Sequence, residues 1–256
     1  SLEVVEEIKT AINGFKSEAI DQSGYHIDYS KLKNTPAYHK YIGQIIPKLR
    51  TMDVTKLTDP KVATAFWINL YNALVIHAVI EFGITKSLMS GGPQNYVRFF
   101  RRAAYRVNGQ RFSLDDIEHG VLRGNRGNPS YFTPQFSSND MRQVCVIEPV
   151  DPRIHFALNC ASQSCPPINL YAGENLDQQL DMAAGNFMQH EVKWNRGTLW
   201  LSMIFKWYGR DFGTEENMLD LIKDYLKEDP QHAEWISNKQ TSVQIKYSPN
   251  NWGLNL

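Results

Sequence analysis

The stretch KVATAFWINLYNALVIHAVIEF, residues 61–82, decides the fold. It is apolar on nearly every side, and a helix without a polar face is normally buried all round. Asp59-Pro60 before it has the form of an N-cap followed by a proline in the first turn. The length would also cross a bilayer, but four polar side chains interrupt the stretch, which is costly in lipid: Asn69, Asn72, His77 and Glu81. The sequence therefore predicts a central core helix.

Shorter helical patterns surround this central stretch. Residues 2–20 carry apolar side chains at helical spacing, and Asn34-Thr35-Pro36 marks the start of a helix that ends near Arg50. Four later segments also predict helices, at 114–123, 175–189, 202–208 and 215–226. Helices are therefore expected to dominate residues 1–100, and the remainder is expected to be mixed.

Hairpins and short strands are expected only after that helical part. Asn108-Gly109 and a glycine-containing turn at 195–197 predict two hairpins, within 104–114 and 192–201. Further strands are expected at 144–150, 153–158 and 241–247. Helices followed by interspersed hairpins predict the α+β class. We expect one helix-rich domain over residues 1–256, with a central buried helix and a small antiparallel sheet.

The composition narrows the class of protein. Apolar residues make up 42% and charged residues 21%, which is typical of a globular chain, and 27 Lys plus Arg balance 27 Asp plus Glu. We therefore expect no nucleic acid partner and no membrane span. Three cysteines are too few for a disulfide scaffold, although a bridge between Cys160 and Cys165 is conceivable. The N-terminal residues show no signal peptide pattern, so we expect a soluble protein, either cytoplasmic or secreted with its signal removed.

The loop RIHFALNCASQSCPP, residues 153–167, carries the clearest chemical signal. The predicted strand stops at Asn159-Cys160, and small residues with free backbone N–H groups follow. A thiolate nucleophile is placed in such surroundings, whereas a lone cysteine is more often a structural core residue. Cys165 is a competing thiol, because prolines after it suit the first turn of a helix that would lower its pKa. Spacing alone does not choose between the two cysteines.

A short acidic helix contains a second candidate group. Asp115 and Asp116 precede His119 by four and three residues, so either could orient its imidazole, whereas Glu118 points about 100° away. The plainer reading is a solvated helix whose aspartates cap it, since Ser113 and Asp116 have the form of a capping box.

In the central helix, Asn69 and Asn72 share a face. If they are buried, they would either bind the backbone of neighbouring loops, or Asn72 would point into a cleft.

Cofactor motifs are missing from the sequence. His77, His119 and His155 are metal-ligand types, but no pair of histidines or cysteines has the spacing of a zinc site. No P-loop, GxGxxG or GxSxG motif occurs. We therefore expect no metal and no cofactor.

Several stretches together resemble the DUF547 family, a domain of unknown function. The matching segments span most of the chain from about residue 60: AFWINLYNA at 65–73, SLDDIEHGVLR at 113–123, HFALNCASQSCPP at 155–167, LSMIFKWYGRDF at 201–212 and NWGLN at 251–255. Some members look like papain-type cysteine peptidases, in which an acidic residue completes a Cys–His pair. In papain-like enzymes the cysteine comes first, whereas here His119 precedes Cys160, so a papain-like architecture would need a permuted or unrelated arrangement.

The resemblance also bears on individual residues. In the family, the cysteine that matches Cys160 recurs where the second cysteine is serine, and the Glu118-His119 pair recurs, while the position of His155 varies. This implies that Cys160 is the nucleophile and His119 its base. We predict a cysteine hydrolase, most directly an endopeptidase that acts on a peptide or protein substrate.

In this prediction, His119 takes the Cys160 proton, and Glu118, or alternatively Asp116, orients the imidazole. Backbone N–H groups of residues 160–162, together with Asn72, bind the oxyanion, and each such donor is typically worth ~3 kcal/mol. The residues expected to shape the substrate groove are Trp67, Asn69, Tyr71, Arg153 and His155.

Two other functions stay open. In a non-enzymatic interaction module, Cys160 would be a core residue and the asparagines of the central helix would be structural. In a thiol redox protein, Cys160 and Cys165 would alternate between dithiol and disulfide.

Overall fold

The long apolar stretch forms the central helix of the protein, as predicted. The computed structural model describes residues 1–131, 133–237 and 243–256. Helix α5 (Pro60–Glu81) begins at Asp59, whose carboxylate accepts hydrogen bonds from the backbone N–H groups of Lys61 and Val62. It ends before Gly83, which has a positive φ. An 18-residue window of α5 is hydrophobic enough for a membrane span, but 83% of that window is buried inside the protein, which supports the interpretation as a core helix.

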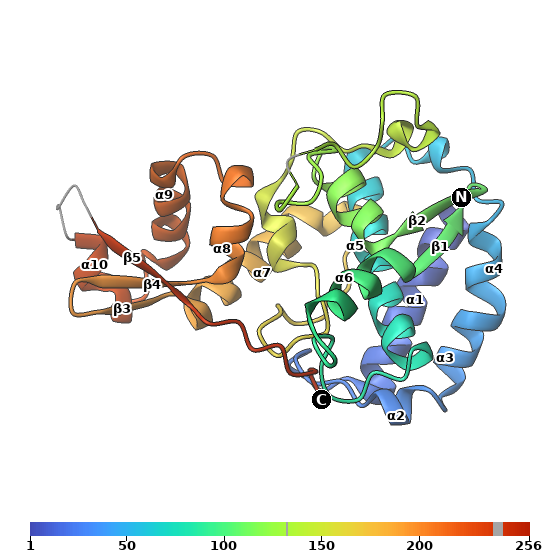
Figure 1. Cartoon of the computed structure of the whole chain (residues 1–256), viewed down its shortest axis with the longest axis horizontal. Coiled ribbons are helices and arrows are strands. Elements are labelled where there is room, and N and C mark those ends of the chain that lie inside the picture. The colour runs from blue at the N-terminus through green and yellow to red at the C-terminus, as the bar shows by residue number, and fades with distance from the viewer. Residues whose placement is uncertain (132, 238–242) are drawn as a thin grey trace.

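Helices cover α5 on the N-terminal side of the molecule, on the right in Figure 1. They are α1 (Leu2–Ala19), α2 (Tyr29–Leu32), α3 (Pro36–Lys40), the π-helical turn η1 (Tyr41–Ile45), α4 (Ile46–Leu49), the 3₁₀ turn η2 (Val54–Lys56) and α6 (Pro93–Arg102). The predicted helix from residue 34 to 50 is thus present as consecutive helical segments from Pro36 to Leu49, with a π-helical turn in the middle. Thr35 caps α3 by accepting a hydrogen bond from the Tyr38 backbone N–H, so the predicted start is confirmed.

The C-terminal part, on the left in Figure 1, surrounds a second apolar core. It consists of α7 (Leu176–Glu191), α8 (Met203–Trp207), the turn η7 (Gly209–Asp211), α9 (Glu215–Leu226), the turn η8 (Pro230–His232), α10 (Ala233–Ser237) and three strands. The strands β3 (Lys193–Asn195) and β4 (Thr198–Ser202) form an antiparallel hairpin, and β5 (Gln244–Ser248) pairs with β4 in parallel. The α+β class is confirmed, and the parallel pairing extends the antiparallel sheet that was predicted.

Both predicted hairpins are present. Strands β1 (Ala104–Val107) and β2 (Gln110–Ser113) are joined by Asn108 and Gly109, both with positive φ, as a two-residue hairpin turn of this type requires. Arg196 and Gly197 have positive φ in the turn between β3 and β4. The predicted last strand is β5, except that positions 241 and 242 lie outside the described residues.

Two predicted strands are wrong. Residues 144–150 and 153–158 contain the 3₁₀ turns η4 (Met141–Cys145) and η5 (Pro152–Phe156) and no strand. Asp140 and Asp151 cap these turns, and each carboxylate also binds the guanidinium two residues later. Apolar, β-branched composition suggested strands, but the aspartate caps determine the local structure.

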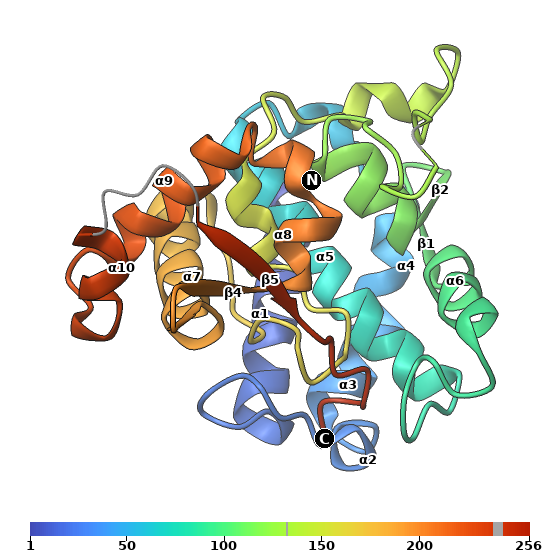
Figure 2. The same ribbon diagram turned by 60° about the vertical axis from the view of Figure 1, so that its left-hand side comes forward.

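The C-terminal tail, residues 249–256, returns from the sheet to the N-terminal side, where it ends beside α2 and α3 in Figure 2. The Tyr29 hydroxyl donates to Asn255 Oδ1 over 2.7 Å, and the Leu254 N–H donates to the Lys86 carbonyl over 2.7 Å. The Asn255 N–H donates to the carbonyl of Ala161. Ala161 lies in the loop that carries Cys160 and Cys165, here called the cysteine loop. The tail therefore holds that loop against the helical part.

A close backbone approach in the turn η6 (Gly173–Asn175) yields a stability prediction. A Cβ on Gly173 would lie 2.9 Å from the backbone N of Val62 in α5. We expect Gly173→Ala to lower the free energy of unfolding by about 1–3 kcal/mol in urea titrations, because the helix must shift. Gly43→Ala is the control, since a Cβ there meets nothing within 4 Å and alanine favours helix. Equal unfolding midpoints for the two variants would contradict this packing.

Candidate active site

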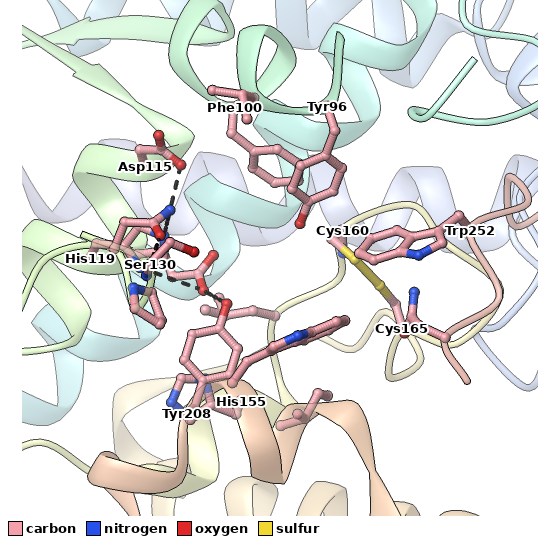
Figure 3. Close-up of a pocket in the computed structure, with 18 of the residues that line it drawn as sticks. Tyr96, Phe100, Asp115, His119, Ser130, His155, Cys160, Cys165, Tyr208 and Trp252 are labelled. Carbon is pink, nitrogen blue, oxygen red and sulfur yellow. Dashed lines mark hydrogen bonds and ion pairs between the residues drawn. A yellow bond between two sulfur atoms is a disulfide. The ribbon is translucent and has the colours of Figure 1, made fainter. Parts of the chain in front are cut away.

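A pocket with a volume of about 340 Å³ lies where the two parts of the molecule meet. It is bordered by α6, the turn η3 (Asp116–Leu122), the cysteine loop, α8 and the C-terminal tail. Figure 3 shows Asp115 and His119 on one side, Cys160 and Cys165 on the other, and Tyr96 and Tyr208 between them. Sequence-distant segments thus bring both predicted chemical groups to one cavity.

The wall that holds the histidine begins with a capping box, as predicted. Asp116 Oδ2 accepts hydrogen bonds from the Ser113 backbone N–H (2.9 Å) and hydroxyl (2.8 Å), and the Ser113 hydroxyl accepts one from the Asp116 N–H. Asp116 is therefore occupied in the cap and with Arg142, and it does not orient His119. The predicted helix 114–123 is mostly a π-helix, a form that is frequent at functional sites.

Glu118 is buried in the pocket wall but is held mainly by phenols. Its two carboxylate oxygens accept hydrogen bonds from Tyr71 (2.8 Å) and Tyr208 (2.5 Å), whereas Oε1 lies 3.8 Å from His119 Nδ1. Burial raises its pKa, but His119 and the phenol donors lower it more, so the pKa lies below its usual value. Glu118 is therefore an anion in the wall and not the closest partner of the imidazole.

Arg123 holds that imidazole. Its Nη1 lies 3.1 Å from His119 Nδ1 and donates to the Gly127 carbonyl over 2.6 Å. Its Nε and Nη2 bind Asp211, whose side chain is fully buried. Burial lowers the pKa of His119 to about 4, and the nearby Arg123 charge adds to this effect. His119 is therefore neutral at physiological pH.

His155 shares the same aspartate. Its Nε2–H donates to Asp211 Oδ2 over 2.8 Å, and its ring stacks on Tyr208 with centroids 4.0 Å apart. Burial lowers the pKa of His155. Although burial would raise the pKa of Asp211, hydrogen bonds from His155 and Arg123 hold it well below its usual value. His155 lines the pocket, and its ring contacts Asp211, Tyr208 and Phe212.

Asp115 stands apart from these satisfied groups. Among the described residues, its carboxyl group receives no hydrogen bond; its neighbours are His119 Nε2 and Arg101 Nε, each 3.8 Å away. Burial, followed by the charge of Glu118, raises the pKa of Asp115 to about 7, against the opposing charge of Arg101. Asp115 also lines the pocket. With this pKa, its carboxyl group can take up and release a proton near neutral pH.

The opposite wall carries the two cysteines, joined as a disulfide. Cys160 is half-buried and Cys165 is buried. The Ser162 hydroxyl lies 3.6 Å from Cys160 Sγ and 3.1 Å from Cys165 Sγ. In the described part of the chain no hydrogen bond joins Cys160 to His119, so this structure does not contain the predicted thiol–imidazole contact.

Three of the predicted oxyanion donors have other partners. The Cys160 N–H faces Cys165 Sγ at 3.1 Å, and the Ala161 N–H donates to Asn159 Oδ1 over 2.8 Å. Asn72 is fully buried and bridges two backbone groups, the Ala157 carbonyl and the Asn159 N–H. The structure thus gives Asn72 the structural role of fixing the start of the cysteine loop.

Three predicted groove residues lie away from the pocket wall. Asn69 binds the backbone N–H and carbonyl of Tyr171, and Trp67 packs against Phe112 in the core. Arg153 makes ion pairs with three aspartates: Asp151, Asp177 and Asp181. Asn69 and Trp67 lie on the buried face of α5, and the aspartates near Arg153 hold its guanidinium away from the pocket. Only Tyr71 and His155 of the predicted groove residues line the pocket.

Residues behind and around the pocket were not singled out from the sequence. Arg123, which lies behind His119, follows it by four residues, which is a helical-neighbour signal, whereas nothing local links Arg123 to Asp211, 88 residues further on. The apolar wall consists of side chains scattered along the chain: Met89, Tyr96, Val97, Phe100, Trp207 and Trp252. Within residues 1–131, 133–237 and 243–256, no cluster of three or more His, Cys, Asp or Glu is arranged to hold a metal ion.

Comparison with known proteins identifies one family. The family model described as "Protein of unknown function, DUF547" matches residues 54–188, more than half of the chain. This range contains α5, the pocket wall with Asp115, Glu118 and His119, and the cysteine loop. No curated protein and no solved structure matches the chain.

The buried ion pair yields a prediction about the site. We expect Arg123→Gln to lower the free energy of unfolding by about 3–5 kcal/mol, because Asp211 loses its main buried partner. Arg126 binds the same carboxylate, but its side chain is 45% exposed. Arg126→Gln should therefore cost less than about 1 kcal/mol. Guanidinium unfolding curves of both variants measure the difference, and equal losses would contradict a central role for Arg123.

Proposed function

The chain belongs to the DUF547 family, and we propose that its pocket is the active site of a cysteine hydrolase, most directly an endopeptidase, with Cys160 as nucleophile. One observation carries this proposal: the Cys160 loop and the Asp115–His119 wall border the same cavity. A redox exchange between two cysteines needs no acid–base groups across a pocket. A hydrolase needs a nucleophile, a proton carrier and a place for an acyl group between them.

The lining of the pocket suggests the class of substrate. Aromatic and aliphatic side chains of α6, α8 and the tail form the apolar wall of the pocket. They include Tyr96, Phe100 and Trp252. Ligand pockets of this kind bury an apolar group and orient it with a few polar atoms. We therefore propose a peptide whose bulky apolar or aromatic side chain lies beside the scissile amide.

The nucleophile must first be released from its disulfide. Two external thiols supply two electrons and leave as a disulfide, while the bond between Cys160 and Cys165 breaks and each sulfur becomes a thiol. The Cys160 thiolate then attacks the acyl carbon, the amine leaves with a proton, and water hydrolyses the thioester. Oxidation would store the enzyme in an inactive form.

The disulfide itself favours a second candidate function, thiol–disulfide exchange. Cys160 is the more accessible of the two sulfurs, and the Ser162 hydroxyl is within reach of both. An external thiolate would attack Cys160 Sγ to form a mixed disulfide, and Cys165 would leave as the thiolate. A papain-like architecture is a further proposal from the family resemblance; in this chain the histidine precedes the cysteine.

Two cysteine variants separate these functions. We expect the reduced wild-type protein and Cys165→Ser to cleave members of a fluorogenic peptide library that carry bulky apolar residues, and Cys160→Ala to lose at least 10³-fold of that rate. Only the wild type should reduce insulin disulfides if exchange is the function. Cleavage that persists in Cys160→Ala, with matched purity and folding, would rule out the hydrolase mechanism.

A further inference from the structure

The environment of His119 determines which of its nitrogens carries the proton. Arg123 Nη1 lies 3.1 Å from Nδ1, and a guanidinium has donors but no acceptor. Nδ1 must therefore present its lone pair, and the single proton of the neutral ring sits on Nε2. Placing protons on both nitrogens would set an N–H group against the Arg123 N–H. The Arg123–Asp211 pair thus selects the Nε2–H tautomer.

Nε2–H faces the pocket without a close acceptor. Asp115 Oδ1 is 3.8 Å away, beyond hydrogen-bond length, and the Asn128 amide nitrogen is 3.4 Å away. The same ring nitrogen cannot accept from Asn128 while it carries a proton. In the described part of the chain, a buried donor and the unbonded carboxyl group of Asp115 therefore border the same cavity, on the wall opposite Cys160.

We infer that Asp115 is the catalytic acid–base residue of this pocket, and that His119 stays neutral and donates Nε2–H to the carbonyl oxygen of the substrate. The inference rests on the proposed hydrolase and changes the predicted role of His119 from base to electrophile. Arg123 is a positioning residue that acts through His119. A neutral imidazole that polarises a carbonyl is a known catalytic device, and positioned donors commonly contribute more than other single groups.

The proton balance of the reaction follows. The Cys160 thiolate forms a bond to the acyl carbon, and negative charge on the oxygen is met by His119 Nε2–H. Protonated Asp115 gives its proton to the amide nitrogen as the C–N bond breaks and the amine leaves. The Asp115 carboxylate then takes a proton from the water that attacks the thioester. As the C–S bond breaks, the carboxylic acid and the Cys160 thiolate are released, and Asp115 is again protonated.

The charges around Asp115 suit this role. Arg101 and Tyr96 face it from α6, and Asp116, Glu118 and His119 face it from its own segment. Burial and the neighbouring acids raise the pKa of Asp115 to about 7, so both protonation states are available at neutral pH. Because folding raises this pKa, the contribution of Asp115 to stability is present at low pH and is lost as the pH rises toward 7 and above.

A spectroscopic experiment tests the role of His119 without any substrate. In ¹⁵N-histidine-labelled protein, the His119 signals, assigned with His119→Gln, should show protonated Nε2 and unprotonated Nδ1 from pH 5.5 to 8. The signals of the exposed His190 serve as an internal control. An imidazolium or an Nδ1–H tautomer at position 119 near pH 7 would overturn the inference.

Asp115→Asn tests the carboxylate by three readouts. Peptide cleavage should fall by about 10²–10⁴-fold, the typical contribution of acid–base catalysis, while alkylation of reduced Cys160 by iodoacetamide should change less than about twofold. The melting temperature of the variant should exceed that of the wild type at pH 8, and the gap should close by pH 4. Asp224→Asn, on the exposed side of α9, is the matched control and should behave as wild type.

These outcomes separate the inference from the proposed function. Unchanged cleavage and pH profile in Asp115→Asn, or no gain in melting temperature at pH 8, would overturn the role of Asp115 even if Cys160 is essential. Cleavage that survives in Cys160→Ala but not in Asp115→Asn would discard the thiol nucleophile and keep the acid–base residue.

Discussion

The ion pair between Arg123 and Asp211 is the interaction on which the site depends. It is buried and joins the turn η3 beside the central helix to the turn η7 of the C-terminal part. Burying two charges is costly unless their remaining donors and acceptors are also bound. Here Arg123 also contacts His119 and the Gly127 carbonyl, and Asp211 also accepts a hydrogen bond from His155. Both buried charges therefore have further polar partners.

This pair also sets the electrostatics of the pocket. Burial keeps the His119 imidazole neutral, and the positive charge of Arg123 behind it adds to this effect. The Arg123 guanidinium also fixes the tautomer of the ring. Two phenols donate hydrogen bonds to the Glu118 carboxylate. Burial, followed by the charge of Glu118, raises the pKa of Asp115. Neighbouring carboxylates with pKa values pushed apart are a recurring way to assign separate roles to like groups. One carboxylate is structural here, and the other is available for proton transfer.

Much of the fold could be predicted because its signals are local. The long apolar run of α5 behind its Asp59-Pro60 start and the Asn108-Gly109 turn each specify their structure from neighbouring residues. The strand predicted at 153–158 is wrong because Asp151-Pro152 starts a 3₁₀ turn there, as Asp59-Pro60 starts α5, and this local cap outweighs the apolar composition. The parallel pairing of β5 with β4 joins segments more than 40 residues apart, and no local pattern specifies it.

The site was only partly predictable for the same reason. Cys160, His119 and Glu118 were selected from local motifs and family resemblance, and all three line the pocket. The role of Asn72 depends on the backbone of Asn159, and the properties of Asp115 depend on how α6 covers it. Such facts come from tertiary packing, which spacing along the chain does not contain.

The most direct test of the account is a crystal structure of the reduced protein treated with a peptidyl chloromethyl ketone that carries a bulky apolar side chain. The account predicts a thioether at Cys160 Sγ, with the ketone oxygen within hydrogen-bond distance of His119 Nε2. An inhibitor attached elsewhere, or one whose oxygen points away from His119 while Cys160 is modified, would contradict it.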